Sequence, residues 1–228
     1  MAKRQSRRSS LKKGRPPANQ RNRKQRCLIV SGGEVTEAQY FELLQDRYQH
    51  LVLSVKSEVG SPDQVADYAA KLVAGSNSLK DEDGYAAVFV VVDVDDFLVD
   101  QFKRAEGKCG SIKAMLAISN PCFEVWLIDY RQPCPDSFTA TKACEDKAKS
   151  LGLVRGSRGK SLSVAFAQNV VHTLPDAVAN AERHNTYGRR QERERLDSLS
   201  FAPWTDMPQL IKALDRLNLD QPGDNLTL

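Results

Sequence analysis

The chain has 228 residues, of which 41% are hydrophobic and 27% are charged. This is the composition of a globular protein long enough to bury its own core, and it excludes a fibrous or wholly disordered chain. No apolar run approaches the roughly 20 residues of a membrane-spanning helix, and the first residues lack the apolar segment of a secretory signal, so we expect a cytoplasmic protein without membrane contact.

The charge is divided unevenly along the chain. There are 33 Lys and Arg against 29 Asp and Glu, but residues 1–26 hold eleven of the basic residues and no acidic one. Residues 27–228 are therefore net acidic. A segment this rich in Arg, Lys, Ser and Pro cannot bury a core, so we expect a disordered basic arm, which serves either as a solubilising tail or as a nucleic-acid contact. The candidate phosphate-binding residues of this arm are Lys12, Lys13, Arg15, Arg21, Arg23, Lys24 and Arg26.

Strand and helix patterns alternate after the arm. A short apolar run at 27–30 stops at Ser31-Gly32-Gly33, which predicts a buried strand and a tight turn. Thr36 and Gln39 have the spacing of a capping box that opens the next helix. The remaining elements predicted up to residue 130 are strands at 51–55, 86–92 and 115–118 and helices at 61–74, 97–105 and 123–130.

Two of these elements carry especially clear signals. Ser61 and Gln64 form a second capping box with Pro62 at the first helical position, and Gly75 is expected to end that helix. The run 86–92 has seven consecutive apolar residues, which is typical of a strand buried on both faces of a parallel sheet. Strands that alternate with helices predict an α/β fold with a mostly parallel sheet flanked by helices.

The second half of the chain is predicted to be mainly helical. Residues 139–187 have helical character, with Gly152 as a helix C-cap, and Thr205 is expected to cap a last helix. We therefore expect four parts: a disordered arm (1–26), an α/β core (27–135), a helical part packed on or beside that core (136–219) and a polar tail (220–228).

Two acidic clusters follow predicted strands, at the edge where open parallel sheets bind ligands. Glu34 and Glu37 follow the first strand, and Asp93, Asp95 and Asp96 follow the most buried one. Clustered carboxylates repel one another unless a cation lies between them, and oxygen ligands select Mg²⁺ or Mn²⁺ rather than zinc. Such a site suits phosphodiester hydrolysis. Alternatively, these acids cap the following helices or face solvent.

A third polar cluster spans residues 120–124. The simplest interpretation makes Asn120 a helix N-cap and Glu124 a first-turn acid that favours the helix dipole, but it does not explain Glu124 if that side chain is buried beside the aspartates. Residues 156–161 resemble a phosphate-binding loop, but Val154 stands where such a loop requires Gly, so we expect only a flexible basic loop. The five cysteines form no C-x-x-C pair, which favours reduced thiols and argues against a Cys/His zinc site.

Several of these motifs resemble the RloB-like proteins, a family associated with bacterial anti-phage defence and restriction loci. The resemblance covers most of residues 27–217. It is carried by residues 28–41 (LIVSGGEVTEAQYF), 91–97 (VVDVDDF) and 118–127 (ISNPCFEVWL), and by Trp204-Thr205-Asp206 with Leu210-Ile211. The family resembles Toprim domains, so the resemblance implies a Toprim-like sheet in which a Glu after the first strand and an Asp-x-Asp after the third bind a metal.

The Toprim pattern is matched only in part. Asp93 and Asp95 match the Asp-x-Asp element, but the family commonly has Glu-Gly where this chain has Gly32-Gly33. The usual glutamate is therefore replaced by Gly32, and Glu34 or Glu37 would have to substitute for it. This departure bears on catalysis more than on the fold.

The resemblance implies two alternative functions. The first is a Toprim-like nuclease that depends on Mg²⁺ or Mn²⁺ and cuts RNA or DNA. The second is a catalytically degenerate subunit that binds nucleic acid or regulates a partner ATPase. For the nuclease, the expected catalytic residues are Glu34, Glu37, Asp93, Asp95 and Glu124, the expected metal ligands are Asp93, Asp95 and Asp96, and Asn120 is expected to orient the site. A third and weaker alternative is a hydrolase that acts on a nucleotide or other small phosphate ligand, for which the basic arm would have no role.

Overall fold

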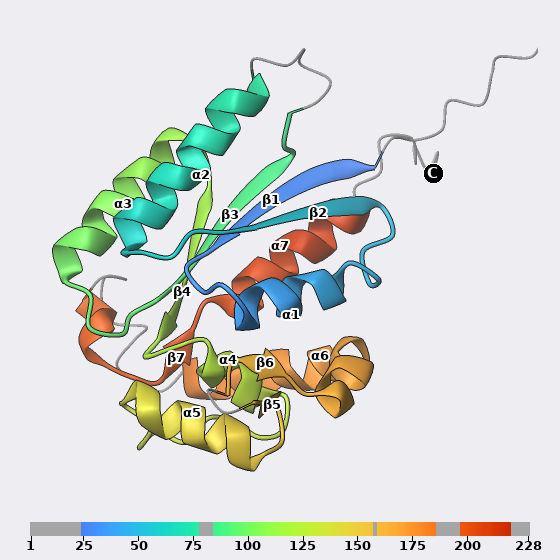
Figure 1. Ribbon diagram of the computed structural model, residues 1–228, viewed down its shortest axis with the longest axis vertical. Coiled ribbons are helices and arrows are strands. Elements are labelled where there is room, and N and C mark those ends of the chain that lie inside the picture. The colour runs from blue at the N-terminus through green and yellow to red at the C-terminus, as the bar shows by residue number, and fades with distance from the viewer. Residues whose placement is uncertain (1–23, 78–83, 157–158, 186–196, 220–228) are drawn as a thin grey trace, which may run out of the picture.

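A five-stranded, mostly parallel sheet forms the centre of the computed structural model, which describes residues 24–77, 84–156, 159–185 and 197–219 (Figure 1). The strand order is β2-β1-β3-β4-β7, and only β7 runs antiparallel, beside β4. The predicted α/β fold is confirmed. The strands are β1 (Gln25–Ser31), β2 (Leu51–Ser57), β3 (Ala87–Asp93), β4 (Met115–Asn120) and β7 (Trp204–Thr205).

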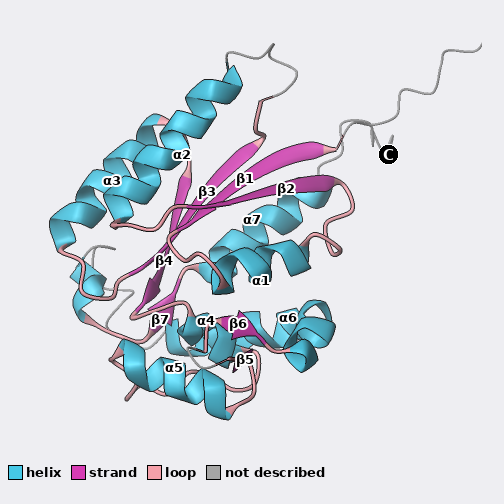
Figure 2. Cartoon of the chain, viewed as in Figure 1, coloured by secondary structure: helices cyan, strands magenta, loops and turns pink. Residues whose placement is uncertain are grey.

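Helices cover both faces of this sheet (Figure 2). Successive β1 side chains point to opposite faces, so Cys27 and Ile29 enter one core, while Leu28 and Val30 enter the other. The helices α2 (Pro62–Asn77) and α3 (Val99–Ser111) close one face, and α1 (Thr36–Leu44) and α7 (Met207–Leu219) close the opposite face. Burial on both faces is the physical reason for the uninterrupted apolar run of β3.

A second group of elements lies next to α1 (Figure 1). It consists of α4 (Glu124–Asp129), α5 (Thr141–Ser150), the hairpin of β5 (Val154–Arg155) with β6 (Ser161–Leu162), and α6 (Val164–Asn185). The hairpin interrupts the helical stretch predicted for 139–187, whose last two residues lie outside the described part. One hydrophobic core extends from Cys27 to Leu214, so the predicted 136–219 part shares a core with the sheet and adds strand β7 to it.

The capping box predicted at Thr36 and Gln39 is wrong. The Thr36 hydroxyl donates to the carbonyl oxygen of Lys160 at 2.6 Å, and Gln39 Oε1 accepts from the backbone N–H of Leu162 at 2.9 Å. Neither side chain caps α1, whose N-cap residue is Val35. Both residues instead connect the β5–β6 hairpin to the start of α1. Their side chains form hydrogen bonds with backbone groups distant in sequence and not with the local backbone N–H groups that a capping box uses.

The cap predictions at Gln64, Gly152 and Thr205 agree with the structure, whereas Gly75 does not end its helix. Gln64 Oε1 accepts from the Ser61 N–H at 2.9 Å, although α2 continues two residues beyond Gly75. Gly152 follows α5 with a φ of +68°, the left-handed conformation that glycine adopts at helix ends. Thr205 Oγ1 accepts from the first N–H of α7, that of Met207, at 3.2 Å.

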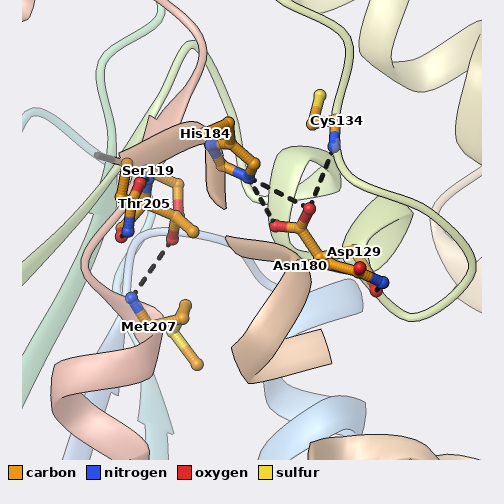
Figure 3. A network of polar contacts seen from close by, with 8 residues as sticks. Ser119, Asp129, Cys134, Asn180, His184, Thr205 and Met207 are labelled. Carbon is orange, nitrogen blue, oxygen red and sulfur yellow. Dashed lines mark hydrogen bonds and ion pairs between the residues drawn. The ribbon is translucent and has the colours of Figure 1, made fainter. Parts of the chain in front are cut away.

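A buried polar network joins α4, α6 and β7 (Figure 3). His184 Nε2 lies 2.8 Å from Asp129 Oδ2, and Asp129 Oδ1 accepts from the Cys134 N–H at 3.0 Å. Both side chains of the His184–Asp129 pair are fully buried. Burial raises the pKa of Asp129 to about 6, against the opposing effect of His184. Ser119 Oγ and Thr205 Oγ1, 2.9 Å apart, extend the contacts to the sheet.

Within the described residues, no helix combines the length and apolarity needed to cross a membrane.

Candidate functional site

A cavity of about 860 Å³ opens where the strands β1, β2 and β3 end. The backbone there is fixed by hydrogen bonds between neighbouring strand ends, including one of 2.9 Å from the Gly32 N–H to the Val91 carbonyl. The segments after all three strands, the start of α4 and one residue of the hairpin form its wall. The charged residues that line it are Glu34, Glu37, Asp93, Asp95, Glu124 and Lys160. Glu34 and Glu37 of the first predicted cluster therefore meet Asp93 and Asp95 of the second in one cavity.

Glu37 lies in the first turn of α1 and is only 7% exposed. Burial, together with the negative charges of Glu124 and Asp95, raises the pKa of Glu37 to about 7, against a lowering by its own backbone N–H and by Lys160. The carboxylate rests against Gly33, because a Cβ built on that glycine would lie 2.0 Å from both carboxylate oxygens. Gly33 thus leaves the space that Glu37 occupies.

Asp93 is the last residue of β3, and its side chain reaches the same cavity. Its buried Oδ1 has no hydrogen-bond partner among the described residues. Burial raises the pKa of Asp93 well above its usual range, and Glu37, Glu124 and Asp95 add to the effect. A buried carboxylate oxygen with an unfilled acceptor position is a ready ligand for a cation.

Glu124, the first residue of α4, is buried, so the first-turn interpretation alone does not account for it. Burial raises its pKa, while the positive charge of Lys160 and a hydrogen bond from the Cys122 thiol oppose that shift. Glu37, Asp93 and Glu124 are therefore three buried or half-buried acids that lie near enough to affect one another's protonation.

The remaining predicted site residues lie in different surroundings. Glu34 and Asp95 line the cavity but are exposed, and Asp95 Oδ1 accepts from the Thr141 hydroxyl at 2.7 Å. Asp96 is exposed and does not line the cavity. Asn120 does not cap a helix, because α4 starts at Glu124 with Phe123 as its N-cap. The Asn120 amide instead donates to the carbonyl oxygens of Leu199 and Phe201, both at 2.9 Å.

Lys160 lines the cavity but was not among the site residues predicted from the sequence. It lies 36 residues beyond Glu124 in sequence, just before β6, and Thr36 holds its carbonyl oxygen at the cavity wall. Its Nζ lies 2.9 Å from Glu145 Oε1. Burial acts to lower the pKa of Lys160, but the hydrogen bond to Glu145 and the charges of Glu124 and Glu37 outweigh it and raise the pKa. The basic character of the 156–161 loop was the only sequence signal for this residue.

The carboxylate oxygens of the cavity are suitable ligands for a hard cation, but the described side chains do not form a complete coordination shell. Among the described residues, no three His, Cys, Asp or Glu side chains are arranged so that they could hold a metal ion together. Mg²⁺ does not require such a cage, because it retains water ligands and is often held by one or two carboxylates together with substrate phosphates. Asp93, with its unpartnered Oδ1, fits that mode of binding.

The predicted phosphate-binding residues that the structure describes lie away from this cavity. Lys12, Lys13, Arg15, Arg21 and Arg23 are outside the described residues. Lys24 precedes β1, and the Arg26 guanidinium packs 4.9 Å above the Tyr85 ring. Both residues belong to the amino end of β1, whereas the cavity is at its carboxyl end. Any contact between the arm and a ligand in the cavity depends on residues before Lys24.

Comparison with known proteins agrees with the motifs that frame the cavity. Searches of curated proteins and of solved structures found no match to the chain. The protein-family comparison matched residues 27–214, which include all of the sheet except the first two residues of β1 and all the charged residues of the cavity. The chain belongs to the family of RloB-like proteins.

Proposed function

We propose that the protein is a divalent-cation-dependent phosphodiester hydrolase that cleaves nucleic acid in bacterial defence against phage. The observation that carries the proposal is the set of three interacting acids, Glu37, Asp93 and Glu124, that face one cavity at the carboxyl edge of the sheet. Structural acids are seldom buried together without cationic partners, whereas catalytic sites use such arrangements to shift pKa values.

Each residue has a role that follows from its surroundings. Asp93 and Asp95 would hold Mg²⁺ or Mn²⁺ together with a substrate phosphate. The bound ion would lower the pKa of water and neutralise charge on the phosphate. Glu37, with a pKa of about 7, is suited to accept the proton of the attacking water near neutral pH. Glu124 keeps that pKa raised, and Lys160 places a positive charge in the cavity for the phosphate.

A cleavage assay tests this function with matched variants. Labelled RNA and DNA oligonucleotides are incubated with the full chain in Mg²⁺, in Mn²⁺ or in EDTA. Cleavage is expected only with the metals, and Asp93→Asn and Glu37→Gln should each reduce it by about 100-fold or more. Asp96→Asn is the control, because Asp96 is exposed and does not line the cavity. Equal cleavage by wild type and Asp93→Asn would refute the assignment.

A second candidate function is favoured by one specific observation. Gly32 stands where the family commonly has a glutamate, so the site lacks one expected carboxylate. The protein would then bind nucleic acid at the cavity without cutting it, or would act through a partner ATPase. Metal-dependent binding without cleavage, alone and with such a partner, would support this second function over the first.

A further inference from the structure

The acidic cavity is also lined by exposed apolar side chains. Val35, Val59 and Phe97 line the cavity and are exposed, Val59 by 70% and Phe97 by 37%. They follow β1, β2 and β3 respectively, and none belongs to either hydrophobic core cluster. Exposed apolar side chains that line a polar cavity are typical of a ligand site rather than of a folding core.

The backbone that carries Phe97 is well anchored. The Phe97 N–H donates to the Val94 carbonyl at 3.0 Å and closes a turn in which Asp95 has a φ of +40°. The Asp95 N–H donates to the Pro121 carbonyl at 2.9 Å, and its carboxylate accepts from Thr141. The structure therefore presents an aromatic ring on a backbone fixed to the end of β4 and to α5, which limits the entropy lost when a ligand packs on that ring.

We propose that the cavity takes one unpaired nucleotide of a single-stranded nucleic acid, with its base packed on Phe97 and its phosphate at the carboxylates and Lys160. The proposal rests on the proposed function and names its substrate class. A base within a duplex is already stacked and paired, so its face is not available to an aromatic side chain. A base of a single strand is free to stack, and every base has such a face.

The dimensions and charges of the cavity agree with this occupant. Its volume of about 860 Å³ lies within the roughly 300–1,000 Å³ of ordinary small-ligand pockets, which suits a single nucleotide. The carboxylates of the cavity would repel a phosphate without a cation, whereas a base can pack on Phe97 whatever its charge. We therefore expect binding that requires a divalent cation and responds to the presence of bases.

The competing occupant of this surface is a partner protein. Leu98, which is 71% exposed, and Val99 continue the apolar surface beyond Phe97 but do not line the cavity. A protein interface would use these two residues at least as much as Phe97. A nucleotide in the cavity would use Phe97 and leave Leu98 without effect, so the pair Phe97→Ala and Leu98→Ala separates the two occupants.

The test measures binding of fluorescent 15-mers to the full chain in Ca²⁺ and about 150 mM salt, which weakens contacts made by the basic arm. The probes are oligo-dT, oligo-U, an abasic strand and a duplex, all of one length. The wild type should bind at least one base-bearing single strand more tightly than the abasic strand and the duplex, and the better of dT and U identifies the preferred sugar. Phe97→Ala should weaken that binding by roughly 5- to 150-fold without changing abasic binding, while Phe97→Trp retains it.

Several outcomes would overturn the proposal. They are equal binding of base-bearing and abasic strands by the wild type, equal or tighter binding of the duplex, no effect of Phe97→Ala, or a larger loss from Leu98→Ala. Because Phe97 is exposed and outside the cores, its variants should melt at the wild-type temperature, which checks that they fold. The assay measures binding and not cleavage, so the two proposals can fail separately. Single-strand preference without hydrolysis would refute only the proposed function. Hydrolysis without a loss of binding in Phe97→Ala would refute only this inference.

Discussion

Replacing Glu37 by Gln should stabilise the protein above neutral pH. The pKa of this carboxyl is about 7 in the folded chain against 4.5 for an ordinary glutamate, so the folded protein holds the proton more tightly than the unfolded chain does. Stability from this group is therefore full below pH 4.5, falls as the pH rises through the window from 4.5 to 7, and is lost above it. At about 1.4 kcal/mol per pH unit, the charged carboxylate costs at most about 3 kcal/mol of unfolding free energy at pH 8.

Urea unfolding of the wild type and Glu37→Gln at pH 8 and pH 5 measures this cost. The variant should gain up to about 3 kcal/mol at pH 8, equivalent to about 6–12 °C in melting temperature for a chain of this size, and less than about 1 kcal/mol at pH 5. Glu34→Gln is the matched control, because Glu34 is exposed and its replacement should change little at either pH. A Glu37→Gln variant that is no more stable than wild type at pH 8, or equally stabilised at both pH values, would show that burial does not raise the pKa of Glu37 in the folded protein.

Three further predictions concern the surroundings of the site and the polar network. Gly33→Ala places a Cβ 2.0 Å from the Glu37 carboxylate oxygens and must displace them, so its cleavage rate should fall as far as that of Glu37→Gln while its melting temperature stays near wild type. Gly32→Glu meets no atom within 3.8 Å of the new Cβ, so calorimetry should record tighter Mn²⁺ binding than in Gly32→Gln. His184→Ala removes the imidazole partner of the buried Asp129 carboxylate and should lower the unfolding free energy in urea by about 3–5 kcal/mol, whereas His172→Ala, at an exposed position, should cause no such loss.

The sequence predicted the sheet well because its strands carry an unambiguous signal. A strand such as β3 must be apolar on both sides, and the strand-helix alternation then implies parallel order. Elements without such a signal were missed. The two-residue strands β5, β6 and β7 are too short for any periodicity, and they form because longer elements bring their ends together.

The site could be predicted only as far as strand ends determine it. Glu37 and Asp93 were both among the candidates, since the carboxyl ends of parallel strands share one edge of a sheet. Lys160 was not, because a hairpin brings it to the cavity through a hydrogen bond from Thr36, 124 residues earlier in the chain. The same hydrogen bond explains why the capping box predicted at Thr36 is wrong. The local sequence pattern is present, but the Thr36 hydroxyl donates to the carbonyl oxygen of Lys160.

The prediction that Asn120 caps a helix failed for a related physical reason. An Asn-Pro pair before an apolar run is a common helix start, but here the amide is buried and donates to two carbonyl groups of the segment before β7. Those carbonyl groups need donors because that segment is packed against the sheet, and no local pattern in the sequence records this need.

Calorimetric titration of Mn²⁺ and Mg²⁺ into the full chain tests most directly whether the carboxylate cavity is a cation site. We expect saturable binding by the wild type at millimolar metal or below, unchanged binding by Asp96→Asn, and loss of binding in Asp93→Asn, because Asp93 supplies the unpartnered buried oxygen. Absence of binding by the wild type, or wild-type binding by Asp93→Asn, would show that Asp93 does not hold a cation in this cavity.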